Sequence, residues 1–568
     1  MIRPYLAAAV QMEVEYEPYP ADGTIRFILD AADEAAARGA KLIVFPETSN
    51  AEWFFENPDA AAKVAATRDG WFIGDLCAKA ARHGVYIATG LTELDEETRR
   101  LFNATVVVGP DGKIASLYRK HFLIGYDKRW ATPGDSGFPV IDTPLGNVAA
   151  FICSDARIPE TTRCPALDGA QVLVNTSNWG GADQYTAHVP ARAAENRVWV
   201  VAANKCGRNQ PGKVNVGHSI IVAPGGAIVA EGRNDGPEIV YAEIDPNAAS
   251  DKSWGDVDLF AARRPRYYSI LSTPTAKTPL ARVLRERVRP DEITASASAV
   301  QVSFTESPER TLDLALEYCD YARHRNYTDL IVLPEQFLFR PEAIAADPAG
   351  CAKFSSRALN TFIDWATRGK LHLVLHLVEH GPERRYHSTA YLIHPDGRLD
   401  RYRKTHLTGS EARWATPGPK LEVFPTAFGN VGIMLGHEGL LPEVARCLTL
   451  EGADLICWPC SWKSRHDYSL IAIERVLENR IALVASNRLD SAVPGPSLVL
   501  QSLINRSQSS SASWATVPGQ PDLITALLNL AMSRTKRIYN NTDVFFHRQP
   551  QFYGTLTRDS NAAPRMMR

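Results

Sequence analysis

Three side chains at the ends of predicted strands carry groups that could do chemistry together. Glu47 follows the apolar run LIVFP, Lys120 lies within YRKHF, and Cys153 follows VAAFI. Loops that leave strand ends are common places for binding and catalytic residues. A thiol nucleophile, a carboxylate base and a fixed ammonium are the groups that acyl transfer from an amide requires. Each side chain alone has an ordinary structural interpretation, so the prediction depends on finding all three together.

Short apolar runs that alternate with helical stretches must position these groups. The predicted strands of the first half are residues 5–11, 42–45, 85–91, 103–109, 148–153, 172–175, 198–204 and 219–223. The periodicity of residues 23–38 predicts an amphipathic helix, and residues 186–197 form a second predicted helix. This alternation predicts an α/β fold whose strands are mostly buried.

The same pattern occurs twice in the chain. Gly146–Glu160 reads GNVAAFICSDARIPE, and Gly429–Glu443 reads GNVGIMLGHEGLLPE. The repeat is far longer than the roughly 20 to 50 residues of a solenoid unit, which indicates a duplicated domain. A chain of 568 residues also exceeds the size at which one core usually stops growing. We expect domains at residues 1–272 and 298–568, joined by a linker at 273–297.

The second copy has lost the thiol. In the shared register Cys153 lies opposite Gly436, and a substitute nucleophile at His437 would be offset by one residue. The second copy keeps the other polar positions as Glu335, Lys404 and Glu411. Because glycine has no side chain, we predict that the first half carries the chemistry and that the second half is a degenerate copy.

Composition is ordinary for a globular protein and excludes several classes of partner. Hydrophobic residues make up 45% and charged residues 22% of the chain, and the formal net charge is −2. A near-neutral charge argues against nucleic acid or an anionic membrane as the main partner. No apolar run approaches the roughly 20 residues of a membrane span. Strand-like sequence begins at Leu6, which leaves no room for a cleavable leader, so a cytoplasmic location is predicted.

The order of the motifs resembles the carbon–nitrogen hydrolase (nitrilase) superfamily. The matching elements here are Phe45-Pro46-Glu47, Tyr118-Arg119-Lys120 and Cys153-Ser154-Asp155-Ala156-Arg157-Ile158-Pro159-Glu160. The resemblance covers both copies nearly end to end. It implies an αββα four-layer sandwich in each half, with Glu47, Lys120 and Cys153 meeting at one end of the first sandwich.

The resemblance also implies a role for each of these groups. Cys153 would attack from a sharp strand-to-helix turn, where a helix N-terminus favours the thiolate. Glu47 would take the thiol proton and later activate water. Lys120 and the backbone N–H of Ser154 would hold the oxyanion, and one such donor is typically worth about 3 to 4 kcal/mol of barrier. No cofactor or metal is implied.

One position departs from the pattern of the superfamily. Many of its amidases carry a second glutamate about seven residues after the lysine, where this chain has Asp127 and the second copy has Glu411. The shorter carboxylate reaches less far unless the backbone moves inward. Asp127 is therefore a candidate for substrate positioning, and it leaves open either a larger substrate or a different loop.

Other residues near the motifs are weaker candidates. Trp179 and the aromatic residues 53–55 could form the pocket wall, although ordinary packing explains them equally well. Arg157 and Glu160 are expected to brace the turn through paired charges. The C-x-x-C at 457–460 falls on a predicted buried strand, and His372 and His376 share the face of an apolar strand without a full ligand set.

The sequence thus predicts a cofactor-free thiol amidohydrolase that cleaves a non-peptide C–N bond, in an amide or an N-carbamoyl compound, and releases ammonia or an amine. Within the family that the chain resembles, Cys-Ser-Asp is closer to the motif of the amidase and carbamoyl-amide branches than to the Cys-Trp-Glu motif of true nitrilases. Three alternatives stay open: nitrile hydrolysis through a thioimidate, acyl transfer to an acceptor other than water, and a non-catalytic scaffold. The expected partner is a small-molecule amide. By analogy with the family, the two halves would pair within the chain, with further self-association possible.

Overall fold

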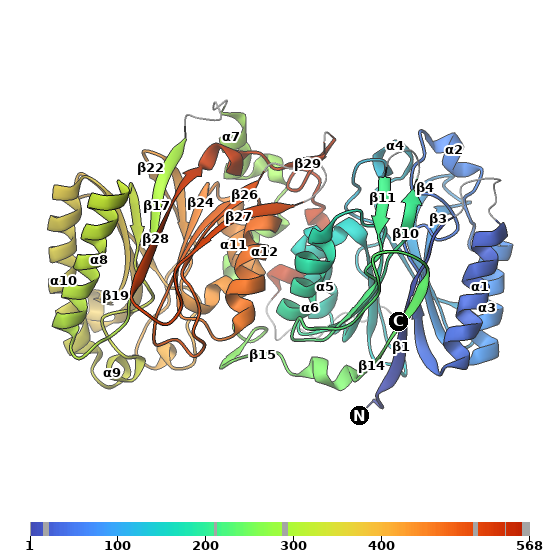
Figure 1. Ribbon diagram of the computed structural model, residues 1–568, viewed down its shortest axis with the longest axis horizontal. Helices are drawn as coiled ribbons and strands as arrows, with labels where there is room; N and C mark the ends of the chain where they lie inside the picture. Colours follow the sequence, from blue (N-terminus) through green and yellow to red (C-terminus); the bar gives the residue numbers. More distant parts are fainter. Residues whose placement is uncertain are drawn as a thin grey trace. The chain divides into compact units, whose positions relative to one another are not determined.

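The computed structural model describes residues 2–14, 22–209, 213–286, 293–503, 509–539 and 541–558. In the first repeat, one six-stranded sheet has the order β14-β1-β2-β3-β4-β5, and a second has the order β13-β12-β9-β8-β7-β6 (Figure 1). The strands of the first sheet are β1 (Tyr5–Gln11), β2 (Ala40–Val44), β3 (Tyr86–Leu94), β4 (Leu101–Val108), β5 (Ile114–Arg119) and β14 (Glu238–Ile244). Those of the second are β6 (Val140–Ile141), β7 (Val148–Ile152), β8 (Val172–Thr176), β9 (Trp199–Ala203), β12 (Ile220–Val222) and β13 (Ile228–Glu231).

The two sheets pack face to face between two layers of helices. Small and branched side chains such as Ala9 and Leu42 of the first sheet meet Val148 and Val174 of the second in one buried cluster. Helices α1 (Asp22–Ala37) and α3 (Trp71–His83) cover the outer face of the first sheet, and α5 (Pro159–Leu167) and α6 (Val189–Asn196) cover the second (Figure 1). The predicted αββα sandwich is confirmed.

Parallel pairing gathers the ends of the central strands. Strands β1, β2 and β3 run parallel, as do β7, β8 and β9. Strands that are buried on both faces have continuous apolar sequences, so their positions could be predicted from the sequence. The predicted helix at 186–197 differs in its first part. It opens as a π-helical turn, Gln184–His188, before α6 begins, and Pro190 near that junction cannot donate a backbone hydrogen bond.

The second repeat has the same architecture. Its sheets have the orders β21-β20-β19-β18-β17-β28 and β22-β23-β24-β25-β26-β27. Their strands are β17 (Thr294–Gln301), β18 (Leu330–Val332), β19 (His372–His380), β20 (Tyr386–Ile393), β21 (Leu399–Arg403), β22 (Val423–Thr426), β23 (Gly429–Ile433), β24 (Leu455–Cys460), β25 (Ala482–Asn487), β26 (Leu498–Leu503), β27 (Ser510–Ala515) and β28 (Asp522–Asn529). The covering helices are α8 (Pro308–Asn326), α10 (Pro348–Gly369), α11 (Pro442–Leu450) and α12 (Ala472–Asn479). The duplication predicted from the sequence is therefore a duplication of the whole sandwich.

The compact units of the chain do not end where the repeats end. The first unit contains residues up to Lys252 together with the segment from Arg537 onward, and the second begins at Ser253. Each repeat's C-terminal segment therefore folds with the other repeat, so the boundaries differ from the predicted 1–272 and 298–568. Within the predicted linker, α7 (Pro279–Arg285) belongs to the second unit and β17 starts at Thr294, while residues 287–292 lie outside the described part.

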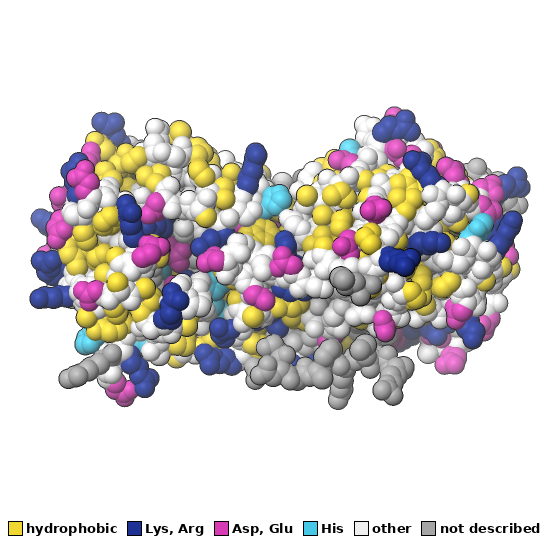
Figure 2. All heavy atoms as spheres, turned by 90° about the horizontal axis from the view of Figure 1, so that it is seen from below, with side chains coloured by type: hydrophobic (Ala, Val, Ile, Leu, Met, Phe, Trp, Pro, Cys, Tyr) yellow, Lys and Arg dark blue, Asp and Glu magenta, His cyan; other side chains and the backbone are white. Residues whose placement is uncertain are grey.

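The face of the molecule drawn in Figure 2 shows no dominant charge. On the face drawn in Figure 2, acidic and basic side chains are intermingled over both repeats, in agreement with a formal net charge of −2. Within the described ranges, no helix has the length and apolar character needed to cross a membrane.

Candidate active site

A pocket of about 270 Å³ opens over Cys153 in the first unit. Its wall includes Trp53, Phe54 and Ile124 on the side of the first sheet, and Ser154, Arg157, Asn178 and Trp179 on the side of the second. The predicted wall residue Trp179 lines the pocket, and its indole N–H donates to the carbonyl of Gly217 at 3.0 Å. Phe55 instead packs against Trp130.

The turn that presents Cys153 has a strained backbone. Strand β7 ends at Ile152, and a 3₁₀ turn, Cys153–Arg157, begins with Cys153 at φ +45°. A side chain in this left-handed region costs roughly 1 to 2 kcal/mol. The matching position of the second repeat, Gly436, keeps the same conformation at φ +52° without that cost. The first repeat therefore holds a thiol at a place that the backbone alone would give to glycine.

This strain leads to a stability prediction. We expect Cys153→Gly to unfold at a higher denaturant concentration than Cys153→Ala, by about 1 kcal/mol in free energy of unfolding, because only glycine relaxes at positive φ. Urea unfolding of the two variants measures the difference. Equal stability of the two, or a more stable alanine variant, would contradict a strained turn.

Asp155 holds this turn in place from within. Its carboxylate accepts hydrogen bonds from the backbone N–H of Ile152 at 3.0 Å and of Phe122 at 2.9 Å, and from the Tyr118 hydroxyl at 2.7 Å. All of these groups are buried. Burial raises the pKa of Asp155 to about 6 although Lys120 and these hydrogen bonds lower it.

Lys120 lies between two carboxylates just beyond the end of β5. Its ammonium donates to Glu47 Oε1 at 2.6 Å and to Asp127 Oδ2 at 2.8 Å, and all three side chains are buried. Burial opposes the charge of Lys120, but Asp127 and Glu47 outweigh it and raise the pKa of the lysine well above its usual range. Since Lys120 carries three N–H donors, two serve the carboxylates in this arrangement.

The shorter Asp127 does reach the lysine. Its carboxylate also accepts the indole N–H of Trp53 and the backbone N–H of Ile124, the latter at 3.1 Å. Asn103 on β4 donates to Glu47 Oε1 at 2.7 Å and to Asp127 Oδ1 at 3.0 Å. The side chains of Trp53 and Ile124 lie in the pocket wall beside the aspartate. Asn103 was not among the predicted site residues, because an asparagine inside a strand carries no motif.

The surroundings of Cys153 favour the neutral thiol. Burial and the neighbouring carboxylate of Glu47 raise the pKa of Cys153, and the opposing effects of Lys120 and of the Asn178 backbone N–H are smaller. The turn after Cys153 has five residues of 3₁₀ helix, so the backbone dipoles that would favour the anion are few.

Lys205 braces the loop that carries Glu47. Its ammonium, fully buried, donates to the carbonyls of Thr48 and Ala51 at 3.1 and 3.0 Å and to the Thr48 hydroxyl at 3.1 Å. Burial lowers the pKa of Lys205 to about 8. In the second repeat Arg488 makes the equivalent bonds to the carbonyls of residues 335, 336 and 339. Neither cation was among the site residues predicted from the sequence.

Arg157 and Glu160 both form charge pairs, as expected. Arg157 lines the pocket, and its guanidinium pairs with Asp183 at 2.6 Å. Glu160 accepts a hydrogen bond from Arg548 at 2.9 Å, in the C-terminal segment that folds with the first unit. The first pair therefore contributes to the pocket and the second to its support.

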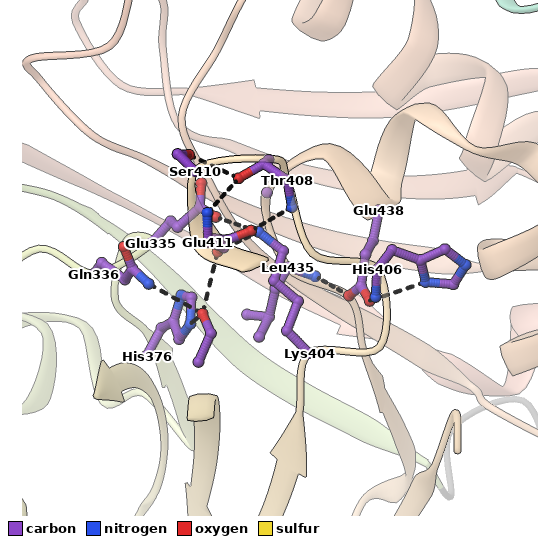
Figure 3. A network of polar contacts seen from close by, with 12 residues as sticks. Glu335, Gln336, His376, Lys404, His406, Thr408, Ser410, Glu411, Leu435 and Glu438 are labelled. Carbon is purple, nitrogen blue, oxygen red and sulfur yellow. Dashed lines mark hydrogen bonds and ion pairs between the residues drawn. The ribbon is translucent and has the colours of Figure 1, made fainter. Parts of the chain in front are cut away.

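The second repeat keeps the charged cluster without the nucleophile. Lys404 donates to Glu335 Oε1 at 3.0 Å and to Glu411 Oε1 at 2.8 Å (Figure 3). A side chain at Gly436 would overlap the carboxylate of Glu335. His437 is buried, and burial followed by the charge of Lys404 lowers its pKa well below the usual range, so its ring is neutral. This cluster lacks the thiol and, as arranged, the space for one.

The other candidates named from the sequence lie in strands and contact neighbouring protein groups. Cys457 and Cys460 are buried in β24, and the thiol of Cys460 contacts the carbonyl of Ser486 at 3.3 Å. His376 on β19 bonds to the hydroxyl of Ser388 at 2.8 Å. Among the residues that the structure describes, no group of three or more His, Cys, Asp or Glu side chains has an arrangement that could hold a metal ion.

Comparison with known proteins assigns the chain to a family. The carbon–nitrogen hydrolase family model matches residues 6–252 and again residues 296–533, so this chain belongs to that family and contains two copies of its domain. A nitrilase of Pyrococcus abyssi is 35% identical over 240 residues, covering 41% of this chain and 88% of the relative. The deaminated glutathione amidase of Mus musculus is 28% identical over 261 residues, covering 43% and 80%. The crystal structure of Saccharomyces cerevisiae Nit3, a member of branch 10 of the nitrilase superfamily, is 26% identical, with a TM-score of 0.40, and covers 44% of this chain and 92% of that one.

Proposed function

We propose that the first repeat hydrolyses the C–N bond of a small amide or N-carbamoyl compound through a thioester on Cys153. The observation that carries this proposal is the buried contact of Lys120 with Glu47, which lies beside the thiol that lines the pocket. Membership of the carbon–nitrogen hydrolase family and the amidase among the relatives support the same reaction class.

The proposed reaction begins from the neutral thiol. As the sulfur of Cys153 attacks the carbonyl carbon, Glu47 takes the thiol proton and the carbonyl oxygen becomes an oxyanion. The third N–H of Lys120 and the backbone N–H of Ser154 would donate to that oxygen. Glu47 returns the proton to the nitrogen as the C–N bond breaks, and ammonia or an amine leaves. Water, deprotonated by Glu47, then attacks the thioester, and the carboxylic acid departs as the thiol is restored.

The lining of the pocket favours an uncharged substrate. Among its described residues Arg157 carries the single formal charge, and that charge is paired with Asp183. A substrate carboxylate or ammonium would therefore have to compete with an existing buried pair or remain unpaired, and both are costly. We expect a short, neutral acyl group that packs against the aromatic side chains of Trp53 and Phe54.

A panel of compounds tests the proposal. Ammonia release would be measured with neutral short-chain amides, N-carbamoyl amines and nitriles, with Cys153→Ala assayed in parallel. We expect neutral amides or carbamoyl compounds to be consumed and the variant to be inactive. Turnover of nitriles alone would instead assign a thioimidate reaction, and turnover that survives the substitution would overturn the role of Cys153. A wild-type protein inactive on the panel, with a thiol at Cys153 that resists iodoacetamide, would favour a non-catalytic scaffold.

The raised pKa of Asp155 predicts an acid limb in the activity. Below pH 6 this carboxyl is protonated in the folded protein and can no longer accept all three of its hydrogen bonds as an anion, so kcat/KM is expected to rise through about pH 6. Stability has the opposite sign. Between the usual pKa of about 4 and the folded value of about 6, the folded state holds a proton that the unfolded state has released. This carboxyl therefore contributes most stability below pH 4 and loses that contribution as pH rises through 6.

A pH–rate profile and urea titrations at several pH values measure both trends, with Asp155→Asn as the comparison. In that variant the acid limb at pH 6 should disappear from whatever activity remains. A wild-type limb that stays in place after the substitution would assign the titration to another group.

A further inference from the structure

The wall of the pocket over Cys153 includes one residue from the far end of the chain. Tyr539 lies on β29 (Arg537–Tyr539), within the C-terminal segment of the second repeat that folds with the first unit. Its half-buried side chain lines the pocket together with Trp53 and Ile124. The catalytic half thus obtains part of its pocket from the half that has lost its thiol.

The hairpin that carries Tyr539 is attached to the loop before Asp127. Asn541 donates to the carbonyl of Gly125 at 2.8 Å, and the backbone N–H of Gly125 donates to the hydroxyl of Thr542 at 3.2 Å. The ammonium of Lys128 donates to the carbonyl of Asn541 at 2.6 Å. These bonds fix the position of the tyrosine relative to the carboxylate that holds Lys120.

Further contacts anchor the rest of the segment. Arg548 pairs with Glu160 at 2.9 Å, and both side chains are buried next to the turn that carries the thiol. Gln549 donates to the carbonyl of His121 at 2.9 Å, and the ring of Phe552 packs edge-on against that histidine. Because the segment is held on both sides of the pocket, Tyr539 is a built part of the wall.

Tyr539 lies close to the groups that are proposed to react. Burial raises the pKa of Tyr539, and the charges of Arg157, Asp183 and Asp127 also act on its hydroxyl. The phenol therefore lies among the polar groups of the site, while its ring adds to the aromatic side of the pocket.

The residue of the second unit that corresponds to Tyr539 is Trp254, and it has different surroundings. The first repeat's segment carries Trp254 on β15 (Ser253–Trp254), and its indole N–H donates to Asp467 at 2.5 Å. Asp467 begins the π turn of the second repeat, where the first repeat has Gln184. In the second unit Trp254 is thus bound by the carboxylate of Asp467. In the first unit the position of Asp467 is occupied by Gln184, whose amide side chain lines the pocket itself.

We propose that Tyr539 is a specificity-determining residue of the first repeat's pocket and limits the length of the group that the pocket admits. The choice of amides as substrates rests on the proposed amidase function. The position of Tyr539 in the pocket wall does not depend on it. It also gives the second repeat a function, since its C-terminal segment completes the site of the first.

Two variants of the full chain test this inference. Tyr539→Leu removes the ring and the phenol and keeps an apolar residue, and Tyr539→Phe removes the hydroxyl alone. The control is Trp254→Leu, the same type of change at the mirrored position. Relative to wild type, we expect Tyr539→Leu to raise the ratio of kcat/KM for hexanamide over acetamide about tenfold, mainly through KM. We expect Tyr539→Phe and Trp254→Leu to leave the ratio unchanged.

Alkylation of Cys153 gives a readout that needs no turnover. The rate of modification by N-hexyl iodoacetamide relative to iodoacetamide, followed by peptide mass spectrometry, should rise about tenfold in Tyr539→Leu and stay constant in the control. If this ratio changes while wild type hydrolyses no amide, the proposed amidase function is wrong but Tyr539 still limits the size of the pocket. Unchanged ratios in a Tyr539→Leu protein with wild-type circular dichroism would overturn the inference, as would an equal change in Trp254→Leu.

Discussion

Replacing Cys153 by alanine is expected to lower kcat/KM for any amide that the protein hydrolyses by on the order of 10⁴-fold or more. The thiol forms the covalent bond to the substrate in the proposed reaction, and the second repeat has glycine at the matching position. Since alanine keeps the backbone and removes only the sulfur, the pocket and the cluster around Lys120 should stay intact. Steady-state kinetics with the best substrate of the panel measure the loss.

Two further variants control this result. Cys77→Ala changes a partly exposed thiol outside the pocket and should keep wild-type kinetics. Restoring a thiol to the second repeat, as Gly436→Cys in the Cys153→Ala background, should not restore turnover, because the new side chain would overlap the carboxylate of Glu335. Substantial activity in that double variant would show that the second site can open, in contradiction to the arrangement described here.

The second large effect concerns the lysine between two carboxylates. We expect Lys120→Met to lower kcat/KM by at least about 10³-fold, because it removes a donor to the oxyanion and leaves Glu47 and Asp127 facing each other without a cation. Loss of one partner of a buried ion pair also costs roughly 3 to 5 kcal/mol of stability. The variant must therefore be assayed under conditions where circular dichroism shows that it is folded.

The repeat supplies a matched control for this substitution. Lys404 lies between Glu335 and Glu411 in the same way, so Lys404→Met breaks an equivalent buried cluster without a nucleophile beside it. Both variants should lose stability to a similar degree, but only Lys120→Met should lose kcat/KM by orders of magnitude. An equal loss of kcat/KM in both variants would mean that the lysine acts through stability alone.

Much of the site could be predicted because its residues follow strongly buried strands. Apolar runs such as LIV at 42–44 and VAAFI at 148–152 form β2 and β7, so Glu47 and Cys153 fall at strand ends as expected. The lost thiol of the second copy was visible for the same reason, since both repeats keep the register around Gly436.

The remaining features depend on tertiary contacts that leave no local pattern. Asn103 joins Glu47 and Asp127 from the interior of β4, and nothing in the strand's sequence distinguishes it from packing. The exchange of C-terminal segments was hidden because both repeats have the same residues in their tails, and these say nothing about which sandwich each tail joins. The shared residues are Asp258, Pro265 and Tyr268 in the first repeat and Asp543, Pro550 and Tyr553 in the second. Tyr539 could therefore not be placed, and the domain boundaries drawn from the repeat differ from the compact units. The raised pKa of the Cys153 thiol depends on its burial in the packed pocket, which no local pattern reports.

Trapping the acyl-enzyme would show directly whether Cys153 is the nucleophile. A p-nitrophenyl ester of the best substrate's acid would be mixed with the protein, because fast acylation by this leaving group allows a thioester to accumulate. Acid quenching and peptide mass spectrometry would follow. We expect a burst of one nitrophenol per chain and one acyl group on the peptide that contains Cys153, with neither seen in Cys153→Ala. An acyl group on another residue, or a burst that persists in Cys153→Ala, would contradict it.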